Sequence, residues 1–489
     1  MTEIAAVLKI TFLALIVFYI CIQVALLISE VRSAEHAADV LPRAFLGKVS
    51  LEQHRKAIDF TAEIVQSDTI NALIGAGIAL LFTFGGGIDI LWAFISVLSD
   101  QGLIPQFVFV MLILLILSIV DLPFDWWRNF RIWERYGMER TDAKQWIRTR
   151  IRTTAVGWLA DMPLFFILLL VLNLSSYFWW IFCLVVSFSW FLWHEYIYPN
   201  WVVGFSKKAT PMPNDSLRRR LQSLLSEQGF SNTKIVTCTR PKQLVHCNAI
   251  LAKRGSETRL VLFNHILTQL SEEEVLAVTA NAVARVAHWH HFARCLLFFL
   301  LNCLFWWGFA WLSEKTYFYE ALGIHPAVAL ANGAVIPGVL VAIAITVFPI
   351  ILYPFIFFVH MFTRMLEYDA DAYVVQTVGS IPLINTIVKL HTDYRNSLTP
   401  NRLYSLANHR RPHVTHRIIA AEAEAGKLRR LALKARQEKL RDRQSLFNSI
   451  LLKRETERLS EDRHTVQLKQ EQLQEAKNLL NRTYTTLNN

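Results

Sequence analysis

The sequence is poor in cysteine and in charged residues. Six cysteines occur among 489 residues, and no two of them form a Cys-x-x-Cys pair. This scattering gives no sign of a disulfide framework or of a thiolate metal site. Charged residues make up only 18% of the chain, and the basic ones are spread over many loops without a recognition motif. The net charge of +11 is therefore poor evidence for nucleic-acid binding, and we expect no nucleic-acid partner.

Apolar residues, by contrast, make up 53% of the chain, which is enough for several membrane spans and a folded domain. Seven runs are long enough to cross a bilayer. They cover Ile4 to Ile28, Ile70 to Leu98, Ile104 to Leu122, Thr154 to Leu174, Tyr177 to Tyr198, Cys295 to Leu312 and Ala329 to Phe362. The sequence thus predicts a mainly α-helical, polytopic membrane protein.

The positions of the basic residues predict how these spans are oriented. Seven spans place four segments on one side of the membrane, and these hold every Lys and Arg except Lys9 and Lys315. The positive-inside rule then puts the N-terminus outside and the bulk of the chain, with the C-terminus, in the cytoplasm. Membrane lipids are the expected partners of the basic surface. The general character of the chain favours a bacterial inner (plasma) membrane.

The last part of the chain has a different composition. From Arg417 to Arg482 there is no proline and only one glycine, which predicts a long charged helix. Apolar residues recur every seven positions at Leu452, Leu459, Val466, Leu473 and Leu480, as in one seam of a coiled coil. Because the second seam is irregular, a solvated amphipathic helix lying on the domain or on lipid headgroups is the other interpretation.

The stretch from Ser271 to His291 is the part of the sequence with the clearest functional pattern. Ser271 and Glu274 form a Ser-x-x-Glu capping box, and an apolar stripe follows, which predicts a helix of about five turns. The preceding run from Arg259 to Leu267 is an apolar stretch with β-branched and aromatic residues and predicts a strand.

This stretch resembles the active-site segment of the integral-membrane zinc metallopeptidases of the HtpX and CAAX prenyl protease type. In that family Leu-Ala-Val-x-Ala is followed by His-Glu-x-x-His, whereas here Leu276-Ala-Val-Thr-Ala280 is followed by Asn281-Ala282-Val283-Ala284-Arg285. The resemblance covers roughly residues 35 to 420. It implies that Asn281 and Arg285 stand where the zinc-binding histidines would be, Ala282 where the general base would be, and His290 at the family's distal histidine.

The replaced residues cannot do the chemistry of the motif. Two histidines one helical turn apart bind one Zn²⁺, and the glutamate between them activates a water. Asparagine is a poor zinc ligand, arginine has no lone pair to offer, and Ala282 cannot accept a proton. We therefore predict no metal or other cofactor at this position, although the family uses zinc.

Other motifs of the family recur along the chain. Glu367-Tyr-Asp-Ala-Asp371 matches Glu-x-x-Ala-Asp, where the resemblance makes Glu367 the third zinc ligand and Asp371 the residue that orients a ligand histidine. Arg411 occupies the place of a histidine that would stabilise the tetrahedral intermediate, and Arg417 agrees with the family. Asn248 and Ala249 match the strand at the substrate side.

Two predictions concern the residues that would replace the zinc site. If the fold is kept, Arg285 faces Glu367, and Asp371 beside it, and neutralises carboxylates that would otherwise be buried without a partner. A shifted metal site formed by His288, His291 and Glu367 is the alternative. The plainer interpretation of these histidines is that they lie solvated at the membrane interface, where Trp289 and His290 enter the bilayer.

Together these patterns predict a helical membrane chamber capped by a small α+β metallopeptidase-like domain. The expected segments are 1–198 with five spans, 199–294 with the degenerate zinc-motif helix, 295–362 with two further spans, 363–416 with the Glu-x-x-Ala-Asp motif, and the extension 417–489. We expect a proteolytically inactive homologue that binds or regulates a hydrophobic or lipid-linked peptide or protein client. It would partner an active relative or assemble with itself through 417–489. The alternatives are an active hydrolase with shifted ligands and a structural membrane scaffold.

Overall fold

The computed structural model describes residues 3–98, 102–137, 142–174, 178–206, 209–213, 215–239, 248–331, 334–391 and 397–487. Most of these residues are helical, as predicted. The chain divides into two compact units, Met1–Glu422 and Ala423–Asn489. The first unit holds the membrane helices and a small sheet, and the second is part of one long helix.

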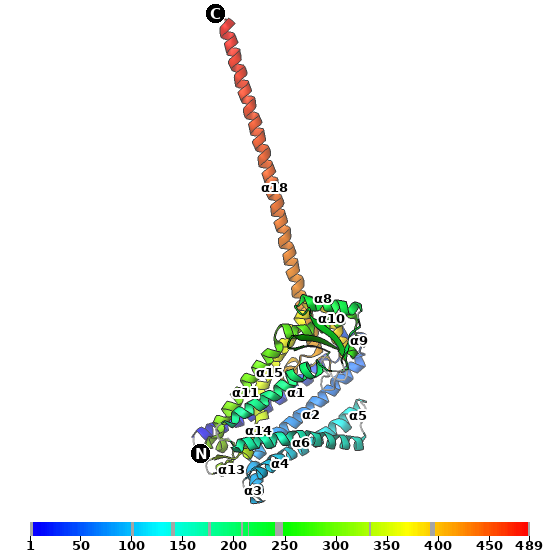
Figure 1. Cartoon of the computed structure of the whole chain (residues 1–489), viewed down its shortest axis with the longest axis vertical. Helices are drawn as coiled ribbons and strands as arrows, with labels where there is room; N and C mark the ends of the chain where they lie inside the picture. Colours follow the sequence, from blue (N-terminus) through cyan, green and yellow to red (C-terminus); the bar gives the residue numbers. More distant parts are fainter. Residues whose placement is uncertain are drawn as a thin grey trace. The chain divides into compact units, whose positions relative to one another are not determined.

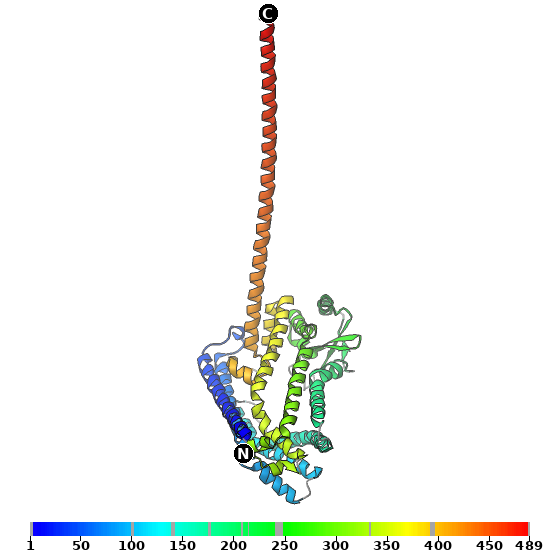
Figure 2. The ribbon, with the colours of Figure 1, turned by 90° about the vertical axis from the view of Figure 1, so that its left-hand side faces the viewer.

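Six helices of the first unit are long and apolar enough to cross a membrane. They are α1 (Glu3–Ala37), α2 (Leu51–Phe82), α4 (Leu103–Trp127), α6 (Ala143–Leu174), α7 (Trp179–Leu192) and α11 (His290–Ser313). The helix α4 is continued by η2 (Arg128–Ile132) and α5 (Trp133–Arg135), and α7 is continued by η3 (Trp193–Val203). The pair α14 (Pro337–Ile351) and α15 (Tyr353–Thr377) is bent by 60° and makes a seventh span if counted as one. Figures 1 and 2 show these helices packed in one bundle.

Two of the predicted spans are not continuous helices in the structure. The run from Ile70 to Leu98 is not one helix, because α2 begins earlier, at Leu51, and α3 (Gly87–Leu98) follows after a break. The break falls at Gly86, whose φ of 71° lies in the left-handed region that favours glycine. The predicted seventh run is interrupted at Leu352, just before Pro354 in the first turn of α15. Proline has no backbone N–H to continue a helix, which is consistent with a bend there.

Short elements connect the spans outside the sheet domain. They are η1 (Arg43–Phe45), α12 (Thr316–Ala321), α13 (Pro326–Ala329), the two-stranded sheet of β5 (Leu330–Ala331) and β6 (Ala334–Val335), α16 (Ser380–Leu390) and α17 (Arg402–Asn408). Of these, α16 packs against α10, the helix that carries the candidate site.

A four-stranded sheet lies between α7 and α11 in the sequence. Its strands are β1 (Thr210–Pro211), β2 (Thr233–Cys238), β3 (Ala249–Arg254) and β4 (Glu257–Phe263), in the order β1-β2-β4-β3. Only the β2–β4 pair is parallel. The helices α8 (Ser216–Glu227), α9 (Asn264–Gln269) and α10 (Glu272–Ala287) belong to the same domain. The predicted strand from Arg259 to Leu267 is therefore too long, since its last residues form α9.

The core of this domain joins one face of the sheet to α8 and α10. Leu221 and Leu225 of α8, Leu260 and Leu262 of β4, and Val283 of α10 are all buried in one apolar cluster. Their burial follows from the period-2 pattern of the strand and the 3.6-residue pattern of the helices. This packing holds α10 at the end of the bundle that carries the sheet, opposite the N-terminus (Figure 1).

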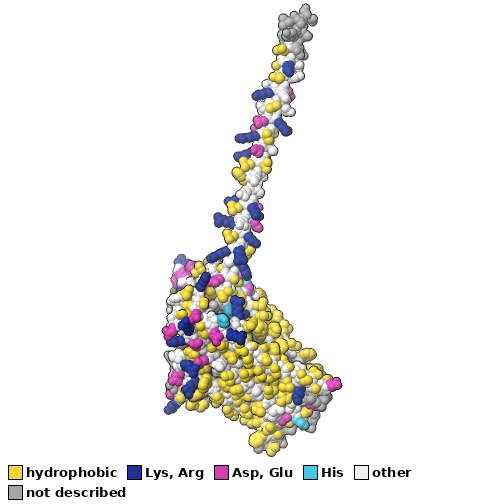
Figure 3. Space-filling model, turned by 180° about the vertical axis from the view of Figure 1, so that it is seen from behind, with side chains coloured by type: hydrophobic (Ala, Val, Ile, Leu, Met, Phe, Trp, Pro, Cys, Tyr) yellow, Lys and Arg dark blue, Asp and Glu magenta, His cyan; other side chains and the backbone are white. Residues whose placement is uncertain are grey.

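The outer surface of the first unit fits the assignment as a membrane protein. Figure 3 shows a broad hydrophobic face with few charged side chains, which gather beside it instead. Exposed apolar side chains such as Leu159, Val185, Leu304 and Trp307 lie on the predicted spans. A soluble monomer rarely exposes so large an apolar area, so this face is suited to lipid.

The C-terminal helix α18 runs from Val414 to Leu487 and crosses the boundary between the two units. The predicted helix is thus confirmed, although it begins three residues before Arg417. In the second unit, Leu452, Leu459 and Val466 are exposed along the single helix. Whether these residues form a coiled coil stays a prediction.

Candidate functional site

The helix α10 is held in place at its N-terminal end by hydrogen bonds. The backbone N–H of Ser271 donates to Oε2 of Glu274 at 2.7 Å, in the predicted capping box. Lys389 of α16 donates to the same carboxylate oxygen at 2.8 Å. Because the carboxylate serves both contacts, the start of α10 is tied to α16 as well as to its own cap.

At the other end of α10, two polar side chains one turn apart face two carboxylates one turn apart on α15. Arg285 Nη2 donates to Glu367 Oε2 at 2.9 Å, so the predicted pair is present. Arg285 Nε donates to Asn281 Oδ1 at 3.2 Å, and Asn281 Nδ2 donates to Asp371 Oδ1 at 3.1 Å. These four side chains form one continuous hydrogen-bonded network.

Arg417 completes this network from α18. Its Nε and Nη2 each lie 2.7 Å from an oxygen of Asp371, in a bidentate arrangement. Glu367 and Asp371 are 6% and 1% exposed, so both would be costly to bury without a cation. Each carboxylate has a guanidinium of its own, and the prediction that Arg285 faces Asp371 as well is wrong, because Asn281 and Arg417 take that role.

The network does not fit a zinc ion at the position that the resemblance implies. Zinc would need lone pairs from the two α10 side chains, yet both Asn281 and Arg285 direct N–H donors at the carboxylates. The guanidinium of Arg285 is a cation without a lone pair, and it occupies an oxygen of the third expected ligand, Glu367. Ala282 is buried and offers no base. These residues therefore support no chemical step through a metal at this position.

The other predicted residues lie on separate elements. Ala249 begins β3, which is an edge strand of the sheet, and Asn248 lies just before it. Asn248 Oδ1 is 3.3 Å from His265 Nε2 on α9. The side chain of Arg411 is exposed, and its backbone carbonyl accepts a hydrogen bond from Arg364 at 3.3 Å.

The histidines after α10 are arranged differently from the prediction. Nδ1 of His288 and Nε2 of His290 lie 2.5 Å and 2.9 Å from the same oxygen of Asp369. His291 Nδ1 instead accepts a hydrogen bond from Arg294 at 3.2 Å, so the shifted site of His288, His291 and Glu367 is not assembled. His290 is only 3% exposed, so the interpretation of it as a solvated interfacial residue is also wrong.

Sequence reasoning missed a second ion-pair network beside the first. Glu195 lies 2.8 Å from Arg294 and 2.9 Å from Arg410. The available signal was Glu195 itself, a carboxylate at the end of an apolar run. Asp369 was missed because it lies between the two motif residues Glu367 and Asp371.

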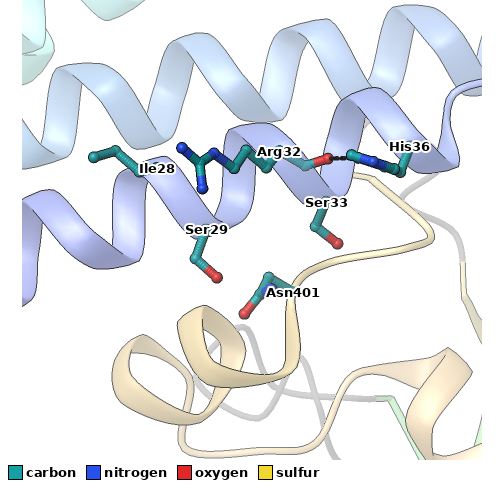
Figure 4. Close-up of a pocket in the computed structure, with 6 residues that line it drawn as sticks. All are labelled: Ile28, Ser29, Arg32, Ser33, His36 and Asn401. Carbon is teal, nitrogen blue, oxygen red and sulfur yellow. Dashed lines mark hydrogen bonds between the residues drawn. The ribbon is translucent and has the colours of Figure 1, made fainter.

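A pocket elsewhere in the first unit is lined by none of the predicted site residues. It lies between α1 and the start of α17 (Figure 4). Its lining consists of Ile28, Ser29, Arg32, Ser33, His36 and Asn401. His36 Nδ1 is hydrogen-bonded to the carbonyl of Arg32 at 2.7 Å, within the lining itself.

A bundle of six or seven spans, a small sheet domain at one end and a buried carboxylate pair facing α10 define an integral-membrane metallopeptidase scaffold. Residues 30–205 match the model described as CAAX prenyl protease N-terminal, five membrane helices, and residues 211–425 match peptidase family M48. The chain belongs to this family of membrane metallopeptidases, which implies zinc for the family.

Curated relatives and a solved structure agree with this assignment. The chain is 24% identical to the CAAX prenyl protease 1 homolog of Taenia solium, over 63% of this chain and 70% of that protein. It is 22% identical to the homolog of Arabidopsis thaliana, over 78% and 91%. The crystal structure of S. mikatae Ste24p is similar in fold, with a TM-score of 0.64 at 18% identity, over 86% of this chain and 99% of that one.

These similarities bear on the predicted location. A multi-pass integral membrane protein is confirmed by the family match and the apolar helices. The relatives named above are eukaryotic, so they give no support to the predicted bacterial inner membrane.

Proposed function

We propose that the chain is a CAAX-prenyl-protease-type membrane protein that binds membrane-associated peptides or proteins without cutting them. The observation that carries this proposal is the contact of Arg285 with Glu367 at 2.9 Å. It puts a permanent cation where the family resemblance calls for a metal ligand. The Arg285 side chain is 22% exposed and that of Glu367 is 7% exposed, so the pair is largely shielded from solvent.

Peptide hydrolysis on this scaffold requires a metal-activated water and a base beside it. Ala282 is the residue at the predicted position of the base, and a methyl group cannot take a proton. Asn281 and Arg285 have their polar atoms engaged with each other and with the two carboxylates. Both requirements therefore fail in the same place.

The client that fits this scaffold is hydrophobic or lipid-linked. The curated relatives are named CAAX prenyl proteases, and the chain has the same kind of membrane bundle. An edge strand such as β3 can add an extended peptide through main-chain hydrogen bonds, and Asn248 and Ala249 begin that edge. Membrane lipids surround the apolar face, with the N-terminus outside and the sheet domain in the cytoplasm.

Two other functions are open to test. An active hydrolase with shifted ligands is favoured by the meeting of His288, His290 and Asp369. A scaffold that assembles with itself or with an active relative through 417–489 is favoured by the exposed apolar residues of α18.

The experiment compares the wild type with a restored variant carrying Asn281→His, Ala282→Glu and Arg285→His. A fluorogenic farnesylated peptide serves both as substrate and, by fluorescence anisotropy, as ligand. We expect the wild type to bind the peptide and leave it intact. We expect the restored variant to take up one more zinc ion per chain than the wild type and to gain cleavage above background.

A matched control keeps Ala282 and changes only Asn281→His and Arg285→His. This control should also take up one more zinc ion than the wild type but show no cleavage, because the base is still missing. Zinc-dependent cleavage by the wild type would refute the proposal and favour the hydrolase. Failure of the wild type to bind the peptide, together with loss of self-association on truncation after Glu422, would favour the scaffold.

A further inference from the structure

Three side chains from two parts of the chain meet just beyond the end of α10. His288 and His290 flank the turn between α10 and α11, and Asp369 comes from α15. Their ligand atoms, His288 Nδ1, His290 Nε2 and one Asp369 oxygen, all lie within 4.8 Å of one another. The closest approaches are the 2.5 Å and 2.9 Å contacts of the two imidazoles with Asp369 Oδ2.

The backbone between the two histidines has an uncommon conformation. Trp289 has φ 57° and ψ 31°, and it is the only non-glycine residue with positive φ in the described part of the chain. A bulky residue in the left-handed region costs about 1–2 kcal/mol. Residues two apart on a continuous helix would point about 200° away from each other. The turn at Trp289 instead lets both imidazoles reach one carboxylate.

The three groups have the chemistry of a transition-metal site. Two imidazole nitrogens and a carboxylate are a common ligand set for Zn²⁺, and imidazole also suits Cu²⁺ and Ni²⁺. Tetrahedral ligands about 2.0–2.1 Å from Zn²⁺ are roughly 3.3 Å apart. The two imidazole–carboxylate contacts would therefore need to lengthen by less than about 1 Å, and the two imidazole nitrogens, which lie within 4.8 Å of each other, would need to reach the same separation of roughly 3.3 Å.

The three side chains differ in their exposure to solvent, and two of them are held by packing. The His290 side chain is 4% exposed, whereas those of His288 and Asp369 are 39% and 49% exposed. Solvent can therefore reach the carboxylate and leave room for a water as the fourth ligand. The ring of His288 also packs edge-on against Tyr373 of α15, with centroids 5.3 Å apart, which limits its rotation.

We propose that His288, His290 and Asp369 bind one divalent transition-metal ion, with Zn²⁺ as the physiological candidate. The ion joins the α10–α11 turn to α15 and is separate from the Arg285–Glu367 pair. No glutamate stands next to these histidines to activate a metal-bound water, so the site does not by itself make the chain a peptidase. A bound ion would stabilise the strained turn, since it binds only the folded arrangement.

The test uses the full chain in detergent, stripped of metal with a chelator and titrated with Zn²⁺ against a chromophoric competitor. His288→Gln and Asp369→Asn remove one exposed ligand each and avoid the buried His290. His291→Gln is the matched control, because that histidine lies next to the cluster but contacts Arg294. Thermal melting with and without Zn²⁺ provides a second readout.

We expect the wild type and His291→Gln to bind one Zn²⁺ per chain and to melt at a higher temperature when it is present. Each ligand variant should bind at least about 10-fold more weakly and lose most of the thermal shift. No stoichiometric binding by the wild type would overturn the site and leave only hydrogen bonds to Asp369. Equal binding by wild type and ligand variants would also overturn it. If Glu367→Gln alone abolishes binding, the metal lies in the network, which refutes the proposed loss of catalysis as well.

Discussion

Removing the cation of the Arg285–Glu367 pair should destabilise the first unit measurably. Arg285→Ala leaves Glu367, whose side chain is 7% exposed, without its nearest cation. Breaking a buried pair from one side costs about 3–5 kcal/mol. Because the Arg285 side chain is itself 22% exposed and Arg417 lies in the same network, we expect the lower end, about 3 kcal/mol.

A double variant also removes the carboxylate charge that Arg285→Ala leaves without a cation. In Arg285→Ala with Glu367→Gln, no buried carboxylate is left without a cation at this position, and about half of the loss should return. A loss of about 3 kcal/mol lowers the melting temperature by roughly 3–6 °C. The shift per kcal/mol is smaller than in a 150–250-residue domain because the entropy of unfolding grows with the size of the unit. The assay is thermal unfolding of the detergent-purified protein, followed by intrinsic tryptophan fluorescence.

Arg219→Ala is the control for a general effect of losing an arginine. Arg219 lies on the exposed side of α8, and its loss should leave the melting temperature within about 1 °C. A double variant as unstable as Arg285→Ala alone would refute the reasoning. It would mean that Arg285 stabilises the fold by packing and not by neutralising Glu367.

Three further outcomes follow from the described contacts. Burial alone would raise the pKa of Glu274, but hydrogen bonds from Lys389 and Ser271 lower it overall. The ionised carboxylate therefore stabilises the fold above its unfolded pKa, and this contribution is lost as the pH falls through its folded pKa. Glu274→Gln should lower the urea midpoint at pH 7 much more than at pH 3. Gly204→Ala should cost about 1–3 kcal/mol, because a Cβ there would clash with the Cβ of Ala252, and a fluorescence melt that does not change would contradict this. Truncation after Glu422 should leave the melting temperature of the first unit unchanged, because nearly all described side chains of the second unit are exposed. Light scattering will show whether the second unit sets the oligomeric state.

The parts of the fold that depend on one-dimensional patterns could be predicted from the sequence. Long apolar runs indicate spans because the bilayer core needs about 20 apolar residues in a helix. Ser271 and Glu274 indicate a helix start because the capping contacts are local. The early start of α2 at Leu51 was missed because the residues before Ile70 are largely polar, and the prediction followed hydropathy alone.

The parts of the site that depend on contacts distant in sequence could be predicted only where a family motif supplied both partners. Arg285 and Glu367 were paired because each stands in a recognisable motif. Arg417 also belongs to a motif, but nothing in the sequence indicated that its guanidinium group would contact Asp371. The turn at Trp289 had no signal at all, since the residue that usually takes the left-handed conformation is glycine.

The substitutions proposed at the site are physically coupled. A zinc site without its metal and its histidines would leave Glu367 buried with no cation, which costs several kcal/mol, whereas Asp371 would keep Arg417. Arg285 supplies a charge to Glu367, and the amide of Asn281 donates to Asp371 as a ligand imidazole would. Each buried carboxylate therefore has its own partners, Arg285 for Glu367, and Asn281 with Arg417 for Asp371. This is why the restored variant must change Asn281, Ala282 and Arg285 together: Arg285→His alone removes a permanent cation and creates no complete metal site.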